Sequence, residues 1–168
     1  MFFEGDVPAV LKAMAEKKKL IESGKDAEGP RILLIGCGGV MYGCEAGGVV
    51  TAFYENGYGE VFDWVLGLST SAPGVGYFLS GKPRIGTTIY SEECCTKDFI
   101  SLRRLSVPVD TGYLDGVIQN KTGKGLNPER IFAHRTQLLI GSPTLSVANK
   151  SLLCRAQPMN YTELCMHL

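Results

Sequence analysis

The chain reads Val61-Phe62-Asp63-Trp64-Val65-Leu66-Gly67-Leu68-Ser69-Thr70-Ser71-Ala72, an apolar run that leads directly into a glycine, a serine and small residues. The part from Phe62 to Leu66 predicts a buried strand, and the segment after Ser69 is compatible with a helix. A strand that turns abruptly into a helix exposes the residue at the corner, close to the unpaired N–H groups of the helix. Ser69 is therefore a candidate nucleophile, and Gly67 and Ser71 are the small residues that flank the corner.

A second corner stands earlier in the chain. Arg31-Ile32-Leu33-Leu34-Ile35 is an aliphatic run too short for a helix, which suits a central parallel strand, and it leads into Gly36-Cys37-Gly38-Gly39. Two such corners side by side can form an oxyanion pocket, with the amides of Gly38 and Gly39 as donors. The alternatives are a plain tight turn at the glycines and a helix-capping role for Ser69.

The pattern around both corners is strand, loop and helix. Residues 45–56 and 72–79 have helical patterns, and Pro73 lies in the first turn of the second helix, where its missing N–H costs little. Residues 137–140 predict a third strand, with residues 152–154 beside it. This succession predicts an α/β fold with a mostly parallel sheet.

Other segments give further expectations. Residues 1–30 predict an amphipathic helix and a linker, with Lys17-Lys18-Lys19 on its solvated face, and residues 31–168 predict the main domain. We expect a loop over 81–88, a helix over 90–105, short helices at 114–118 and 127–132, and a helical pattern over 160–168.

The composition excludes several function classes. Lysine plus arginine and aspartate plus glutamate are both 17, so no global field favours nucleic acid or an anionic membrane. The first residues lack the bases of a signal peptide, and no apolar run is long enough to span a bilayer. We expect a cytoplasmic chain whose contact with membranes is peripheral.

The six cysteines do not form the C-x-x-C spacing of a zinc or redox site, so we expect no metal or cofactor. Most are expected to be small buried thiols. Cys94-Cys95 could form a strained vicinal disulfide, and the alternative is two reduced thiols on a helix.

The motifs resemble a known family. Gly38-Gly39-x-x-x-Gly43, Gly67-x-Ser69-x-Ser71-Ala72 and Tyr77-Phe78-Leu79-Ser80-Gly81 look like the patatin-like phospholipases of the bacterial type, and the likeness extends from Arg31 to the C-terminus. It implies a three-layer α/β/α sandwich that hydrolyses lipid acyl esters with a Ser-Asp dyad and without a catalytic histidine. Neither His134 nor His167 is placed to serve as the base for Ser69, so a Ser-His-Asp triad is not expected.

The chain departs from the family pattern at three positions in the two glycine motifs. Val40 stands at the third glycine of the oxyanion motif, and a β-branched residue disfavours positive φ. Tyr42 stands at the basic position and lacks its charge. Ser71 replaces the second glycine of the elbow, where its hydroxyl could cap the following helix.

The base of the dyad is the larger departure. The family's aspartate lies in an Asp-Gly pair well downstream of the serine, whereas Asp115-Gly116 precedes the predicted third strand. We therefore expect a patatin-like domain that is incomplete on its C-terminal side. An uncovered sheet edge would also favour self-association.

Three functions remain open from the sequence. The first is a serine acyl hydrolase that acts on lipid carboxylic esters. The second is a catalytically impaired or inactive relative that binds only lipid or a partner, because a serine without its base is a poor nucleophile. The third is nucleotide binding, whose Gly-x-Gly fingerprint fails at Met41, where the third glycine would stand.

Overall fold

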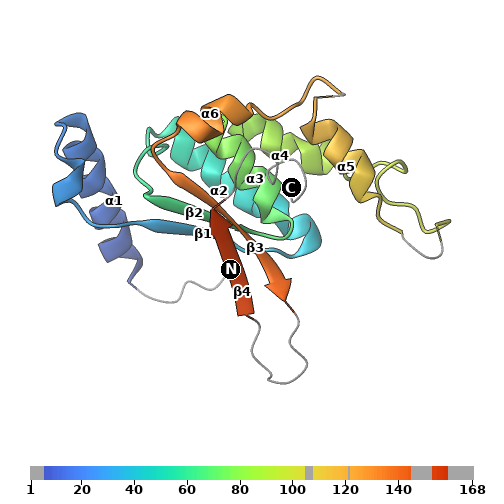
Figure 1. The fold of residues 1–168 in the computed structure, drawn as a ribbon, viewed down its shortest axis with the longest axis horizontal. Helices are drawn as coiled ribbons and strands as arrows, with labels where there is room; N and C mark the ends of the chain where they lie inside the picture. Colours follow the sequence, from blue (N-terminus) through green and yellow to red (C-terminus); the bar gives the residue numbers. More distant parts are fainter. Residues whose placement is uncertain (1–5, 105–107, 121, 145–152, 159–168) are drawn as a thin grey trace.

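The computed structural model describes residues 6–104, 108–120, 122–144 and 153–158. Figure 1 shows the main group of helices behind a sheet, with the N-terminal helix to one side. The strands are β1, Leu33–Gly36; β2, Trp64–Leu68; β3, Gln137–Thr144; and β4, Leu153–Pro158. The helices are α1, Val7–Glu22; α2, Gly43–Glu55; α3, Ser71–Leu79; α4, Pro83–Glu92; α5, Thr111–Ile118; and α6, Pro128–Ala133, with 3-10 helices η1, Asp26–Glu28, and η2, Val40–Tyr42.

The sheet confirms the predicted α/β class. Its order is β1-β2-β3-β4; β1, β2 and β3 are parallel, and β4 pairs antiparallel with β3. Gly36 of β1 lies opposite Gly67 of β2, so both strands end at the same edge of the sheet. The two predicted corners are therefore neighbours in space.

α2, α3 and α4 form the helical layer on one face of the sheet. α3 packs on the strands, and α2 and α4 pack against α3 (Figure 1). The core between these layers consists of Met14, Val50, Val61, Phe62, Val65, Val75, Phe78, Leu79, Ile131 and Leu138. Leu33 and Ile35 point to the other face and are about half exposed. The second helical layer of the expected three-layer sandwich is not seen in the described part of the chain.

The predicted N-terminal helix forms as α1, with the Asp6 carboxylate accepting the Ala9 N–H as its cap. The expectation that its lysine run is solvated is wrong for Lys17, whose side chain is fully buried. Lys17 Nζ donates to Asp26 O at 2.9 Å and lies 3.3 Å from Asp63 Oδ1. A residue with a charged end can bury its stem when the charge finds such partners.

Residues 81–88 are not the expected loop. Pro83 begins α4, whose Ile85 and Ile89 pack in the same apolar cluster as Tyr77. Gly86 has no side chain, which lets the backbone of α4 lie close to Tyr77. The expected helix over 90–105 is also wrong, because α4 ends at Glu92 and turns follow, with an isolated antiparallel bridge between Ile100 and Val109. The spacing of the two isoleucines after a proline is the signal that predicts the true start.

The remaining expectations have mixed outcomes. The short helices, the third strand and its neighbour form as α5, α6, β3 and β4. The pattern over 160–168 lies outside the described residues. No helix within the described ranges has the length and hydropathy to cross a membrane.

Asp63 ties the amino ends of β1 and β2 together. Its carboxylate accepts the Ile32 N–H at 2.8 Å and Arg31 Nη1 at 2.9 Å, besides its ion pair with Lys17. Burial raises the pKa of Asp63, but the hydrogen bonds from Ile32, Arg31 and Lys17 outweigh burial and leave the pKa below its usual value. The ionised carboxylate therefore stabilises the fold.

We predict that Asp63→Asn lowers the free energy of unfolding at pH 7 by about 3 kcal/mol, because it leaves the buried Lys17 without its counter-ion. The control Arg31→Gln, which removes an exposed partner, should cost about 1 kcal/mol or less. Urea denaturation of both variants measures this, and equal losses would contradict it. Since the folded-state pKa is lowered, the gap between wild type and Asp63→Asn should narrow as the pH falls below 3.8.

Candidate active site

Ser69 occupies the corner between β2 and α3. Its φ is +51°, in the left-handed region that residues with a Cβ seldom adopt, and its side chain is exposed. The helix cap is Thr70, and no side-chain cap hydrogen bond is made there. Ser69 is therefore not the helix-capping serine of the alternative interpretation, and its corner has the geometry of a nucleophile elbow.

Gly38 lies directly against this corner. A Cβ built on Gly38 would lie 2.7 Å from Ser69 Cβ, 2.9 Å from Leu68 O and 3.3 Å from Ser69 Oγ. Only a residue without a side chain fits such an approach. The structure thus brings the predicted serine and the first predicted oxyanion glycine together.

Ser71 connects the two corners by hydrogen bonds. Ser71 is buried, and its hydroxyl is within donor distance of two carbonyl oxygens, Gly36 O at 2.6 Å and Leu68 O at 3.0 Å. The same oxygen accepts a hydrogen bond from the Leu68 N–H at 3.0 Å. A Cβ on Gly36 would meet Ser71 Oγ at 2.8 Å, so the serine fills the space that the glycine leaves. The hydroxyl joins the ends of β1 and β2, whereas the sequence also allowed it to cap α3.

Gly67, the other flanking residue, is equally constrained. A Cβ there would meet Ala72 Cα at 2.7 Å and Val75 Cγ2 at 2.8 Å. The missing side chain lets α3 pack directly on the end of β2. Both predicted elbow residues are therefore needed for the close packing of the corner.

Gly39 has a φ of +147°, which favours glycine, and its N–H donates to Thr70 Oγ1 at 3.2 Å. The Thr70 hydroxyl thus occupies the donor that an oxyanion would use. The Tyr42 ring lies against Gly39, 3.2 Å from the position of a Cβ on that residue, and is largely exposed. Val40 begins η2, so its backbone takes a helical conformation in place of the family's glycine geometry.

An apolar cavity of about 340 Å³ opens beside Ser69. Its walls come from η2, α3, α4, the bridge of Ile100 and Val109, and α5, and they include Met41, Pro73, Ile89, Phe99 and Leu114. The volume lies in the usual range of small-ligand sites. Of the residues that line this cavity, the sequence predicts only Ser69 as part of the site, because it predicts a loop over 81–88 and a helix over 90–105 in place of α4 and the bridge.

Two ionisable groups line the cavity, Tyr90 and Cys94. Burial, with the nearby thiol of Cys94, raises the pKa of Tyr90, whose hydroxyl donates to Thr70 O. Burial also raises the pKa of Cys94 to about 11. Both groups are protonated at neutral pH, so neither is a ready base for Ser69.

The carboxylates and the described imidazole lie elsewhere. His134 precedes β3 at the amino edge of the sheet, where its Nε2 lies 3.1 Å from Glu60 Oε1 and its Nδ1 accepts the Thr136 N–H. Asp115 lies within α5 and accepts a hydrogen bond from Gln119. The lining of the cavity, within the described residues, contains no aspartate, glutamate or histidine.

The cysteines of the described residues are free thiols. Cys94 is buried, whereas Cys37, Cys44 and Cys95 are exposed, so the expectation of mostly buried thiols is wrong for these. Cys94 and Cys95 follow α4 as a turn and form no disulfide. Within the described ranges, no group of three His, Cys, Asp or Glu side chains could hold a metal ion.

Comparison with known proteins gives no match to a family model, to a curated protein or to a solved structure. The patatin-like resemblance therefore rests on the quoted motif residues alone. The function of the chain has to be inferred from the corner, its glycines and its cavity.

We predict that Ser71→Ala lowers the free energy of unfolding by about 2 kcal/mol, because Gly36 O and the Leu68 N–H both lose a buried partner. Ser91→Ala is the matched control: Ser91 is exposed on α4 and bonds only within its own helix, so its removal should change stability by about 0.5 kcal/mol or less. Thermal or urea unfolding compares the two. A Ser71→Ala variant as stable as Ser91→Ala would contradict the connecting role.

Proposed function

We propose that this chain is a serine acyl hydrolase of the patatin-like type that acts on carboxylic esters of lipids, with Ser69 as the nucleophile. The observation that carries the proposal is the position of Ser69: exposed, left-handed, packed against Gly38 and open to an apolar cavity. A strained residue at a strand-to-helix corner is typical of functional sites. The complete three-layer sandwich of the family is part of the same proposal.

The proposed reaction begins with attack of Ser69 Oγ on the ester carbonyl. The carbonyl oxygen becomes an oxyanion, which the N–H groups of Gly38 and Gly39 stabilise, and the N-terminus of α3 adds its partial positive charge. For Gly39 this requires its N–H to leave Thr70 Oγ1. The alcohol then departs with the serine proton, and water hydrolyses the acyl-serine.

The lining of the cavity supports a lipid acyl group as the substrate class. Ile89, Phe99 and Leu114 present apolar surface beside the reacting hydroxyl. An alkyl chain in this cavity gains about 0.8 kcal/mol for each buried methylene. A lipid ester at a membrane surface would make the chain peripheral to that membrane.

A second candidate function is favoured by one observation. The described lining of the cavity offers no carboxylate or imidazole to take the serine proton. The alternative is therefore a catalytically impaired relative that binds a lipid ester, or a partner, without turning it over. The two functions differ in turnover and not in the shape of the site.

We predict that an alkyl fluorophosphonate labels the wild type at Ser69 and does not label Ser69→Ala. The reagent phosphonylates an activated serine, and mass spectrometry of the peptides locates the adduct. Ser91→Ala is the control and should be labelled like the wild type. Labelling that persists in Ser69→Ala, or a folded wild type without label, would contradict the role of Ser69.

Ester turnover separates the two candidates. A p-nitrophenyl ester of a fatty acid should be hydrolysed by the wild type and by Ser91→Ala, and not by Ser69→Ala. Labelling of Ser69 without measurable turnover would favour the impaired relative. Turnover equal in Ser69→Ala and the wild type would overturn the hydrolase mechanism.

A further inference from the structure

β1 is an edge strand of the sheet. The strand order places β2 on one side of β1, and in the described part of the chain no strand pairs with the other side. Alternate backbone N–H and C=O groups of β1 therefore face outward without a strand to bond. Such an edge is a template for pairing with another strand.

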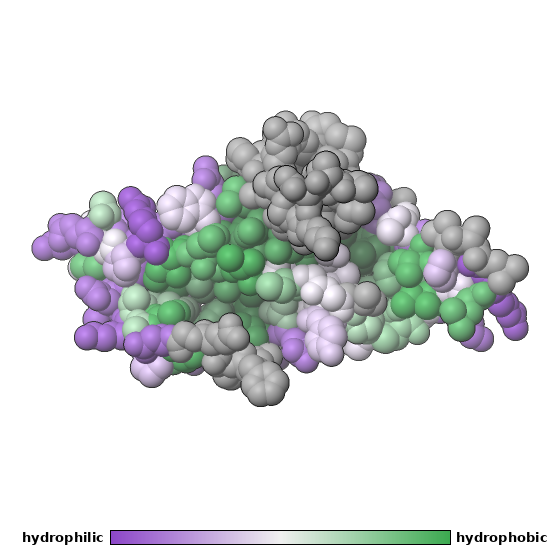
Figure 2. Space-filling model, turned by 90° about the horizontal axis from the view of Figure 1, so that it is seen from below, coloured by the Kyte–Doolittle hydropathy of each residue, from purple (hydrophilic) through white to green (hydrophobic). Residues whose placement is uncertain are grey.

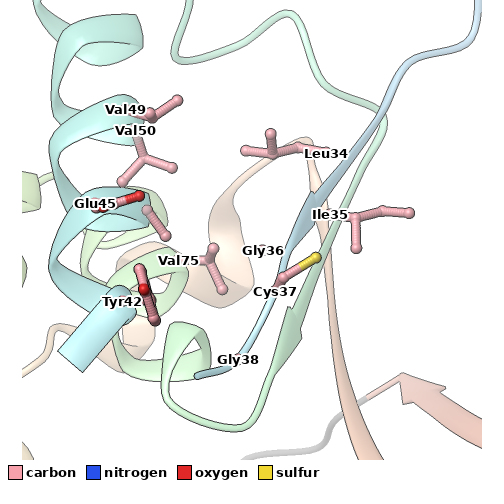
Figure 3. A pocket seen from close by; sticks show the side chains of 11 residues that line it. Leu34, Ile35, Gly36, Cys37, Gly38, Tyr42, Glu45, Val49, Val50 and Val75 are labelled. Atoms are coloured by element: carbon pink, nitrogen blue, oxygen red, sulfur yellow. The ribbon is translucent and has the colours of Figure 1, made fainter. Parts of the chain in front are cut away.

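A groove runs along this free edge. It has a volume of about 370 Å³, lies between β1 and α2, and extends from Leu34 of the strand to Gly38 in the loop that follows it. Figure 3 shows Leu34 extending into the space in front of α2, where Val49 and Val50 face it, while Ile35 points to the opposite side of the strand. The groove therefore lies where a further strand, paired with β1, would place alternate side chains.

The surface around the groove is mostly apolar and open, and Glu45 is the one charged side chain among the described residues that line it. Beside the groove, Val49 of α2 is 43% exposed and Tyr42 of η2 is 68% exposed. On the opposite face of β1, Leu33 is 48% and Ile35 50% exposed. The view of Figure 2 shows apolar side chains gathered across the middle of one face of the molecule. A contiguous apolar surface of this kind marks an interaction site.

The backbone edge of β1 and the apolar side chains of the groove favour an extended peptide over an alkyl chain. An alkyl chain in the groove would cover the outward N–H and C=O groups of β1 and leave them without hydrogen bonds, which is costly. An extended peptide pairs these groups and at the same time places alternate side chains under α2. A β-strand therefore satisfies both walls, whereas a lipid chain satisfies only the apolar one.

The strand that fits is β1 of a second copy. β1 reads Leu33-Leu34-Ile35-Gly36 and carries no charge, so two copies of it can lie side by side without repulsion. The formal net charge of the whole chain is zero, which removes the long-range repulsion that would oppose self-association. In a twofold contact each copy supplies the strand that the other lacks.

We propose that two copies of this chain pair antiparallel through β1 and form one continuous sheet, with each groove covered by the partner's edge strand. This pairing does not involve the reactivity of Ser69, so it stands or falls independently of the proposed function. The contact is isologous, and the proposed register places the twofold axis at Ile35, so that residue 35 of one copy lies opposite residue 35 of the other.

Sedimentation equilibrium across a range of concentrations tests the proposal with charged variants at the edge. The wild type should form dimers, and Ile35→Lys should weaken the dimer about tenfold or more, because like charges meet across the new strand pair. Ile35 is half exposed, so the variant should stay folded, which circular dichroism checks. Leu102→Lys is the control, since Leu102 is 84% exposed and does not line the groove.

A mixture of charges makes the test specific for the twofold contact. Ile35→Lys and Ile35→Glu should each be weak dimers alone, and their equimolar mixture should recover association. The proposal is overturned by a wild type that stays monomeric throughout, by Ile35→Lys that dimerises as tightly as the wild type, or by a mixture that associates no better than its components.

Discussion

Close packing of two strand ends is the constraint on which the rest of the structure depends. Gly38 touches Ser69, Gly36 leaves room for the Ser71 hydroxyl, and Gly67 lets α3 pack on β2. A side chain at Gly36 or Gly38 would push the two corners apart, and one at Gly67 would push α3 away from β2. The same contacts that build the carboxyl edge of the sheet hold Ser69 in a left-handed conformation, so the strain at the candidate nucleophile is supported by its surroundings.

The amino and carboxyl ends of the sheet carry different kinds of residues. At the amino end, Asp63 is paired with Lys17 and Arg31, and His134 Nε2 lies 3.1 Å from Glu60 Oε1. The carboxyl end holds small residues, backbone donors and an apolar cavity. Ion pairs at one end stabilise the fold, and the other end stays open to a ligand. The separation also explains why the described imidazole does not serve Ser69.

Much of the fold was predictable, because β1 and β2 are short apolar runs that lead into glycine and serine. The predictable site residues, Ser69, Gly38, Gly67 and Ser71, are fixed by local backbone geometry, which sequence spacing records. Burial of Lys17 was not predictable, since it depends on Asp63, a partner distant in the sequence. The cavity wall was missed because its residues come from α4, α5 and an isolated bridge, and packing brings these together. The role of Ser71 in joining β1 to β2 likewise depends on a carbonyl of another strand.

The left-handed backbone of Ser69 can be tested directly by comparing the stabilities of Ser69→Gly and Ser69→Ala in urea. Glycine adopts a φ of +51° without a steric penalty, whereas alanine keeps the Cβ that makes this conformation costly. If the corner has the strained geometry described above, Ser69→Gly unfolds with a free energy about 1 kcal/mol higher than Ser69→Ala. A Ser69→Ala variant that is as stable as Ser69→Gly, or more stable, would contradict the strained corner on which the candidate site depends.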